Sequence, residues 1–215
     1  MNKSFVKKYV NHHSEPIEQA LKIMECRAQE ILKSNNKYQD LYIDPDVDIV
    51  NSNPQVIQQV KKELEDFLVL LAKHNVKNLL QIGLGHWAST HFVLSLLLDH
   101  ITTIEYDFTH IRRYLPESCG NCESVLRGDS LTLHSSLEDE SFDAVFIDGN
   151  HSYEYVKQDL ENYYKKVKKG GVVAMHDANF EGDQYGTPQV IRESALEWSF
   201  ISHSKEVGIA YAVKE

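Results

Sequence analysis

This sequence contains few cysteines, no long apolar run and no excess of basic residues. Its three cysteines, Cys26, Cys119 and Cys122, are odd in number and too few for a disulfide scaffold. The longest apolar block, residues 92–98, falls far short of the ~20 residues that span a bilayer. The first residues carry charge but no apolar run of signal-peptide length. We therefore expect a reduced, cytoplasmic protein without a membrane partner.

The charge balance argues against nucleic acid as a partner. The 215 residues include 22 lysines and arginines and 32 aspartates and glutamates, which gives a formal net charge of -10. A field of that sign repels phosphate backbones. Hydrophobic residues make up 42% of the chain, which is enough for a packed core and excludes a wholly disordered or collagen-like chain.

The first third of the chain is predicted to be helical. Apolar residues over 17–31 recur every three or four positions, and a second stripe over 56–71 follows Asn53-Pro54. We therefore expect a helical extension over residues 1–75 and one α/β domain over residues 76–215.

From residue 76 onward, strand-like and helix-like segments alternate. The alternation predicts right-handed crossovers and a doubly wound, mostly parallel sheet. Strands are expected at 76–82, 101–104, 124–127, 142–147 and 172–175, with a closing hairpin at 200–202 and 208–213, and helices at 88–99, 109–115, 152–167 and 188–198.

A pair of glycines follows the first predicted strand. The segment from Gly83 through Gly85 to Ala88 fits the pattern G-x-G-x-x-[GA] between a strand and a helix, where glycine lets the backbone turn and approach a ligand. Glu105 ends the next strand, where a carboxylate can bind both hydroxyls of a ribose. The sequence thus indicates a nucleotide-type ligand. A plain turn is the alternative for the glycines.

A second polar turn, Gly128-Asp129-Ser130, follows the third predicted strand. The carboxylate of Asp129 is placed to accept a hydrogen bond from an exocyclic adenine amine. An Asp-Ser turn without a ligand is the alternative.

Four polar residues are expected to meet at the ends of two neighbouring strands. Asp148 and His151 follow the strand at 142–147, and His176 and Asp177 follow the strand at 172–175. Open α/β sheets bind ligands at the carboxyl ends of their strands. The sequence therefore predicts a catalytic crevice there.

The motifs around these residues resemble class I S-adenosylmethionine-dependent methyltransferases. The resemblance rests on Asp148-Gly149-Asn150-His151-Ser152-Tyr153 and on Gly170-Gly171 followed by His176-Asp177. It implies a Rossmann-like methyltransferase fold with strand order 3-2-1-4-5-7-6 and methylation of a hydroxyl on a small-molecule or sugar-like acceptor. The closing hairpin fits that fold better than a plain dinucleotide-binding fold.

The same resemblance implies roles for individual residues. Gly83 and Gly85 would line the methionine part of the cofactor, Glu105 the ribose, and Asp129 with Ser130 the adenine. Gln81 stands where many methyltransferases carry an acidic residue. The residues expected to bind S-adenosylmethionine are Gln81, Gly83, Gly85, Glu105, Asp129, Ser130 and Asp148.

The resemblance also implies two routes to an activated acceptor. His151 is the candidate base, acting with Asp148. Alternatively, Asp148, His176 and Asp177 hold Mg²⁺ or Mn²⁺, which lowers the pKa of the acceptor hydroxyl. His176 stands where several metal-dependent relatives have an acidic residue, and a histidine ligand favours Mn²⁺ or Zn²⁺ over Mg²⁺.

Two other functions fit part of the sequence. One is a catalytically silent protein of the same fold that binds the adenosyl cofactor. The other is a nicotinamide-dependent oxidoreductase, which shares the glycine turn and the ribose carboxylate. The pair Cys119 and Cys122 lacks the second pair that a zinc site needs, His86 and Trp87 could face the cofactor or pack, and the N-terminal helices could form a homodimer contact.

Overall fold

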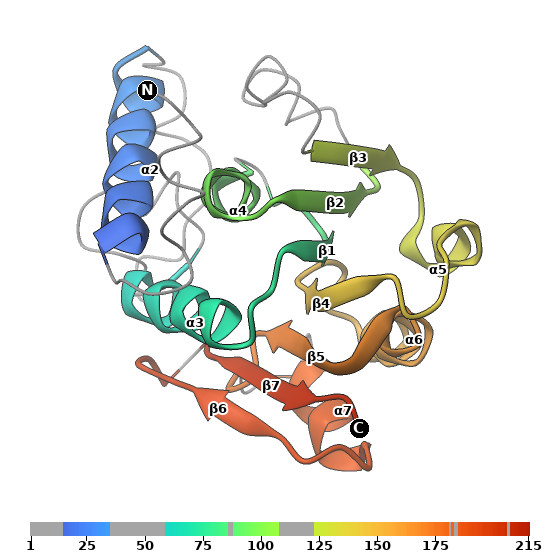
Figure 1. Cartoon of the computed structure of the whole chain (residues 1–215). Coiled ribbons are helices and arrows are strands. Elements are labelled where there is room, and N and C mark those ends of the chain that lie inside the picture. The colour runs from blue at the N-terminus through green and yellow to red at the C-terminus, as the bar shows by residue number, and fades with distance from the viewer. Residues whose placement is uncertain are drawn as a thin grey trace.

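The computed structural model describes residues 15–34, 59–85, 88–107, 123–180, 182, 185–205 and 207–215. Seven strands form one sheet in the order β3-β2-β1-β4-β5-β7-β6, which confirms the predicted order (Figure 1). Strands β1 to β5 are parallel, and β7 lies antiparallel between β5 and β6. The strands are β1 (Asn78–Ile82), β2 (His100–Glu105), β3 (Glu123–Arg127), β4 (Phe142–Ile147), β5 (Val167–His176), β6 (Ser199–Ile201) and β7 (Ile209–Val213).

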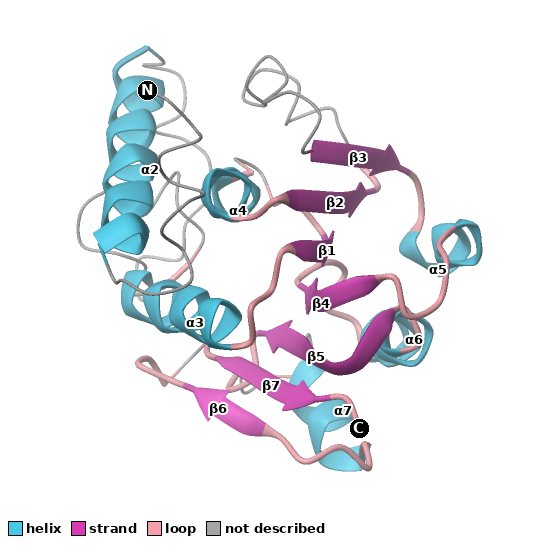
Figure 2. Cartoon of the chain, in the orientation of Figure 1, coloured by secondary structure: helices cyan, strands magenta, loops and turns pink. Residues whose placement is uncertain are grey.

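Helices cover both faces of the sheet, so the fold has three layers (Figure 2). On one face lie α2 (Glu15–Ser34), α3 (Lys61–Lys73) and α4 (Ser89–Leu97). On the other lie α5 (Ser130–Leu133), which a short 3₁₀ turn follows, α6 (Tyr153–Tyr164) and α7 (Thr187–Glu193). Among the described helices, none combines the length and the apolar character that crossing a bilayer requires.

The sheet separates two hydrophobic clusters, because successive side chains of a strand point to opposite faces. Leu79 belongs to the cluster beneath α2, α3 and α4, whereas Leu80 belongs to the cluster beneath α6 and α7. In the first cluster the ring of Phe67 on α3 lies 4.8 Å from the ring of Phe146 on β4. The N-terminal helices therefore share their core with the sheet.

The prediction for the segment before β5 was wrong. The helix ends at Tyr164 rather than continuing to residue 167, and β5 already begins at Val167. The Gly170-Gly171 pair lies inside the strand, where the pairing with β4 shifts register. Gly170 has a φ of 76°, a left-handed conformation that suits glycine at such an irregularity.

Other boundaries differ in smaller ways. Helix α7 ends at Glu193, five residues before the predicted end, and the one-turn helix α5 was not predicted. Ser152 precedes α6 as expected, but its hydroxyl makes no capping hydrogen bond. The helix expected at 109–115, the Asn53-Pro54 start signal, His86, Trp87, Cys119 and Cys122 lie outside the described residues.

Candidate active site

The predicted site residues follow the carboxyl ends of the parallel strands, along one edge of the sheet. The backbone pairing continues past the strands there, because Gly83 donates to the Ile104 carbonyl and Asp148 to the Ile82 carbonyl, both at 2.9 Å. Backbone hydrogen bonds therefore connect the residues that follow β1 and β4 to the last residues of β2 and β1.

Gly83 lies directly against the backbone of Asp148. Its φ is 89°, and a Cβ atom at this position would lie 2.0 Å from the Asp148 carbonyl oxygen. No other residue fits that space without displacing the backbone. The glycine turn therefore lies against Asp148. Gly85 continues it as an exposed residue with a φ of 63°.

Glu105 holds the glycine turn through its carboxylate. Its Oε2 accepts a hydrogen bond from the Leu84 N–H at 2.7 Å, and its Oε1 accepts one from the Asp107 N–H at 2.9 Å. Each oxygen keeps a further lone pair. Gln81 is buried and also holds the glycine turn, because its Nε2 donates a hydrogen bond to the Gly83 carbonyl at 2.8 Å.

The Asp129-Ser130 turn begins α5. Asp129 Oδ1 accepts a hydrogen bond from the Leu131 N–H at 3.0 Å and caps the helix. Asp129 therefore has the structural role in a turn that was the alternative to adenine binding. Asp159 on α6 is a buried carboxyl next to this turn. Burial raises its pKa to about 6, the Ser130 hydroxyl opposes the shift, and the charge of Asp129 adds to it.

The structure brings Asp148, His151, His176 and Asp177 together, as predicted. His151 Nε2 lies 3.1 Å from Asp177 Oδ2 and 3.7 Å from Asp148 Oδ1. His176 Nδ1 lies 3.3 Å from Asp148 Oδ1 and 3.2 Å from Asp177 Oδ1. Each imidazole therefore faces both carboxylates.

This pairing sets the charges of the four groups. Burial opposes charge on His151, but its hydrogen bonds to Asp148 and Asp177 prevail and raise its pKa to about 9. Burial also opposes charge on His176, yet the same two carboxylates raise its pKa well above the ordinary value. In turn, the histidines hold the pKa of Asp148 and of Asp177 below the usual range against the effect of burial. The two carboxylates thus favour the charged form of both imidazoles, and the imidazoles favour the charged form of both carboxylates.

Asp177 has a backbone conformation that is rare for a residue with a side chain. Its φ is 57°, in the left-handed region that aspartate tolerates better than most residues. The N–H groups of the next two residues are tied to the loop between β6 and β7, with Ala178 donating to the Gly208 carbonyl at 3.1 Å and Asn179 to the Val207 carbonyl at 2.7 Å. Such conformations persist where surrounding contacts enforce them, and they occur often at functional sites.

His151 is held by its neighbours but stays accessible. Its ring stacks on Tyr185 with centroids 4.9 Å apart, and Tyr185 stacks on Phe180 at 3.8 Å. Its carbonyl accepts from the Gly186 N–H at 2.7 Å. Because 40% of the His151 side chain is exposed, a bound molecule can reach it.

Three of these side chains have the composition and spacing of a metal-binding group. Ligand atoms of Asp148, His151 and Asp177 lie within 4.8 Å of one another. Two carboxylates and an imidazole suit a divalent ion such as Mg²⁺ or Mn²⁺, so these residues fit the implied metal. This group contains His151, whereas the predicted ligand set contains His176, which is more deeply buried.

Sequence reasoning missed three residues of the site region. Gln59 donates through Nε2 to Asp148 Oδ2 at 3.0 Å, across 89 positions of sequence. Tyr185 stacks on His151, and Asp159 lies beside the Asp129-Ser130 turn. Only Asp159 left a signal, since a carboxylate at a buried helix position departs from the apolar stripe around it.

Comparisons with known proteins agree with the fold. Residues 80–178 match the family of the methyltransferase domain. The uncharacterized protein y4gI of Sinorhizobium fredii is 37% identical over 71 residues, which are 33% of this chain and 8% of that protein. The match therefore spans only a small part of the relative's length.

Solved structures share the fold at low sequence identity. A proposed caffeoyl-CoA O-methyltransferase from Staphylococcus aureus superposes with a TM-score of 0.61 at 18% identity, covering 92% of this chain and 99% of that one. A proposed O-methyltransferase from Klebsiella pneumoniae gives 0.63 at 16% identity, covering 88% and 90%. Cofactor-bound Rv0187 from MTB gives 0.61 at 17% identity, covering 91% and 89%. The chain therefore has a Rossmann-like methyltransferase fold, with the strand order described above, and residues 80–178 match the methyltransferase domain.

Proposed function

We propose that the protein transfers a methyl group from S-adenosylmethionine to a hydroxyl of a small-molecule or sugar-like acceptor. One observation carries the proposal: the glycine turn lies against the backbone of Asp148, whose side chain belongs to the His151–Asp177 cluster. A cofactor held at the turn and an acceptor held at the cluster would therefore meet. The O-methyltransferase neighbours support a hydroxyl as the acceptor group.

The cofactor-binding part of the proposal uses four positions along the edge of the sheet. When bound, S-adenosylmethionine supplies an electrophilic methyl group on a sulfonium. Glu105 has lone pairs left for the ribose hydroxyls, and Asp129 with Ser130, at the start of α5, would bind the adenine. Gly83 has no side chain, so the backbone of the turn can lie close to the methionine part of the bound cofactor. Gln81 contributes by bracing that turn.

His151 acts as the general base in this proposal. Asp177 holds Nε2 of the ring at 3.1 Å, which leaves Nδ1 as the nitrogen that takes the proton of the acceptor hydroxyl. Methyl transfer is an in-line displacement, so the remaining task of the protein is to align the two reactants. The Tyr185 stack and the Gly186 hydrogen bond fix His151 for that task.

A divalent ion is the second route to an activated hydroxyl. Asp148 and Asp177, with His151 or His176, are the residues that would hold it. When bound, the ion supplies a positive charge that lowers the pKa of a hydroxyl and orients it. A metal ion and a proton compete for the same imidazole, so metal binding would release protons.

The first experiment is a thermal-shift titration with S-adenosylmethionine, S-adenosylhomocysteine and NAD, each with and without Mg²⁺ or Mn²⁺. A ligand at 100 times its Kd stabilises the folded state by ~2.7 kcal/mol, a shift of several degrees in Tm. We expect stabilisation by the adenosyl compounds and none by NAD. Stabilisation by NAD alone would favour the oxidoreductase alternative, which antiparallel β7 already disfavours.

The second experiment measures transfer of an isotopically labelled methyl group to a panel of hydroxylated acceptors. We expect product with at least one acceptor, and dependence on Mg²⁺ or Mn²⁺ if the carboxylates hold an ion. Cofactor binding without transfer to any acceptor would contradict the proposal and favour the catalytically silent alternative.

A further inference from the structure

In the described chain just before α3, the side chain of Gln59 reaches the candidate active site. This residue is only 2% exposed, and its Nε2 donates to Asp148 Oδ2 at 3.0 Å. Its Oε1 is also buried and has no hydrogen-bond partner among the described residues. Burying an amide oxygen without a hydrogen-bond partner lowers the stability of the fold, so a buried side chain of this kind suggests a role in the site.

The two oxygens of Asp148 consequently have different partners. Oδ2 accepts from Gln59, whereas Oδ1 lies 3.3 Å from His176 Nδ1 and 3.7 Å from His151 Nε2. The torsion that rotates an aspartate carboxylate is broad and roughly two-fold, so side-chain packing alone fixes it poorly. The hydrogen bond from Gln59 selects the orientation that turns Oδ1 toward both histidines.

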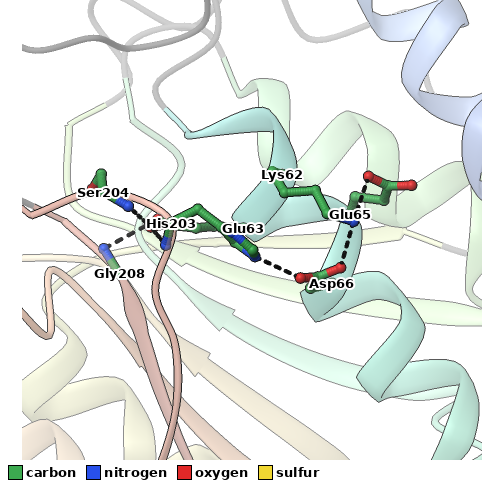
Figure 3. A network of polar contacts seen from close by, with 7 residues as sticks. All are labelled: Lys62, Glu63, Glu65, Asp66, His203, Ser204 and Gly208. Atoms are coloured by element: carbon green, nitrogen blue, oxygen red, sulfur yellow. Dashed lines mark hydrogen bonds and ion pairs between the residues drawn. The ribbon is translucent and has the colours of Figure 1, made fainter.

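Glu63, one turn after Gln59 in the chain, anchors the start of α3. Glu63 is fully buried, and its carboxylate accepts three backbone hydrogen bonds from the loop between β6 and β7 (Figure 3). The donors are the N–H groups of His203 at 2.7 Å, Ser204 at 2.9 Å and Gly208 at 3.1 Å. A carboxylate paired in this way fixes the start of α3 against the loop.

The same loop also holds the chain that follows Asp177. Its Val207 and Gly208 carbonyls accept the hydrogen bonds from Asn179 and Ala178 that enforce the left-handed Asp177. The same loop is therefore bonded to the backbone that follows Asp177 and to the start of α3, which Gln59 precedes.

We propose that Gln59 is a positioning residue for the Asp148 carboxylate and that Glu63 sets its register against the loop that also fixes Asp177. The N-terminal segment then completes the active site rather than merely covering it. The kinetic part of this inference rests on the proposed function, whereas the structural part does not.

The test compares Gln59→Leu and Gln59→Glu with the unmodified protein. Leucine removes the donor at similar size, and glutamate removes it while adding a charge that repels Asp148. A matched control is Gln158→Leu, because Gln158 is exposed on α6 and donates only to the Glu154 carbonyl of its own helix. Crystal structures of the unmodified protein and of Gln59→Leu show the orientation of Asp148, isothermal titration gives the Kd for S-adenosylhomocysteine, and initial rates give kcat and KM.

We expect the Asp148 carboxylate to rotate away from the two histidines in Gln59→Leu while the backbone stays in place. Supporting residues of this kind typically contribute ~10–100-fold in activity, so kcat should fall by that factor with KM and Kd changed less than about twofold. Gln59→Glu should lose more, and Gln158→Leu should match the unmodified protein. An unchanged Asp148 orientation or an unchanged kcat in Gln59→Leu would overturn the proposal.

Glu63→Gln tests the anchor. An amide in place of the carboxylate turns an N–H group toward a backbone N–H, so we expect a lower Tm and a kcat loss similar to that of Gln59→Leu. Its control is Glu65→Gln, at an outward position of α3 that pairs with Lys62. If the unmodified protein methylates no acceptor, the proposed function fails, and the orientation of Asp148 in the two crystal structures still decides the role of Gln59.

Discussion

His151 Nε2 and Asp177 Oδ2 lie 3.1 Å apart and connect the segments that follow two neighbouring parallel strands. The contact holds the ring of an accessible histidine against a carboxylate that is only 7% exposed. An imidazole oriented by a buried carboxylate is a recurring arrangement in proton transfer. It is also close to the arrangement of ligands around a divalent ion, so this contact connects both routes to an activated acceptor.

Replacing Asp148 by alanine should abolish turnover without removing the cofactor site. The substitution takes away a partner of both histidines and a candidate metal ligand. We expect kcat to fall by about 100-fold or more, with the Kd for S-adenosylmethionine changed only a few-fold. Isothermal titration and a methyl-transfer assay measure the two quantities. A fully active Asp148→Ala enzyme would show that the catalytic role is misassigned.

The activity should rise toward alkaline pH. The pKa of His151 is raised to about 9, so the ring carries a proton at neutral pH and can act as a base only in the fraction that has lost it. We expect log kcat/KM without metal to climb with a slope of about 1 up to that pKa. A divalent ion that displaces the proton should move the inflection to lower pH. A profile that is flat from pH 6 to 9, with activity retained in His151→Gln, would exclude His151 as the base.

Replacing Asp159 by asparagine should stabilise the protein at neutral pH. The folded-state pKa of this buried carboxyl is about 6, above its ordinary value, so the folded state binds the proton more tightly than the unfolded state. Stability is thus favoured below the unfolded pKa and lost as the pH rises through 6. The shift corresponds to roughly 1–3 kcal/mol above that pH.

Urea unfolding at pH 4 and at pH 8 separates the two regimes for Asp159→Asn. We expect little difference between variant and unmodified protein at pH 4 and a higher midpoint for the variant at pH 8. Equal stability of the two proteins at pH 8 would mean that the Asp159 carboxylate is accommodated without cost.

Two glycine substitutions should separate backbone strain from steric overlap. Gly83 and Gly170 both have positive φ values, 89° and 76°. A Cβ atom at Gly83 would collide with the Asp148 carbonyl, whereas one at Gly170 would meet nothing within 4 Å. We expect Gly170→Ala to destabilise the fold by about 1–2 kcal/mol and Gly83→Ala by about 3 kcal/mol or more.

Chemical denaturation measures both free energies, and cofactor titration shows the functional consequence. Gly83→Ala should also weaken S-adenosylmethionine binding, since it displaces the turn from Asp148, whereas Gly170→Ala should not. Equal destabilisation by the two substitutions would show that the turn can move away from Asp148 at no cost.

The parallel sheet and the edge that carries the predicted site residues followed from local patterns, whereas the order of the strands was expected from the resemblance to methyltransferases. Apolar β-branched runs that alternate with helical stripes specify a parallel sheet, and parallel strands bring their carboxyl ends to one edge. For that reason Gly83, Glu105, Asp148 and Asp177 could be assigned to one place from the sequence. The end of α6 could not, because Val167 continues the helical spacing and only sheet pairing makes it part of β5.

Only the tertiary structure decided which atoms of the site residues Asp148, His151, His176 and Asp177 contact one another. Gln59 and Asp148 are 89 positions apart, and no periodicity connects a glutamine before a helix with a carboxylate after a strand. The buried Glu63 resembles an ordinary acidic residue in the first turn of a helix, and its three partners come from a loop about 140 residues later. The sequence by itself determined which residue types lie at the ends of the strands, since local patterning sets strand boundaries. Only packing between distant segments decided how these residues are oriented, because long-range backbone and side-chain hydrogen bonds exist only in the folded chain.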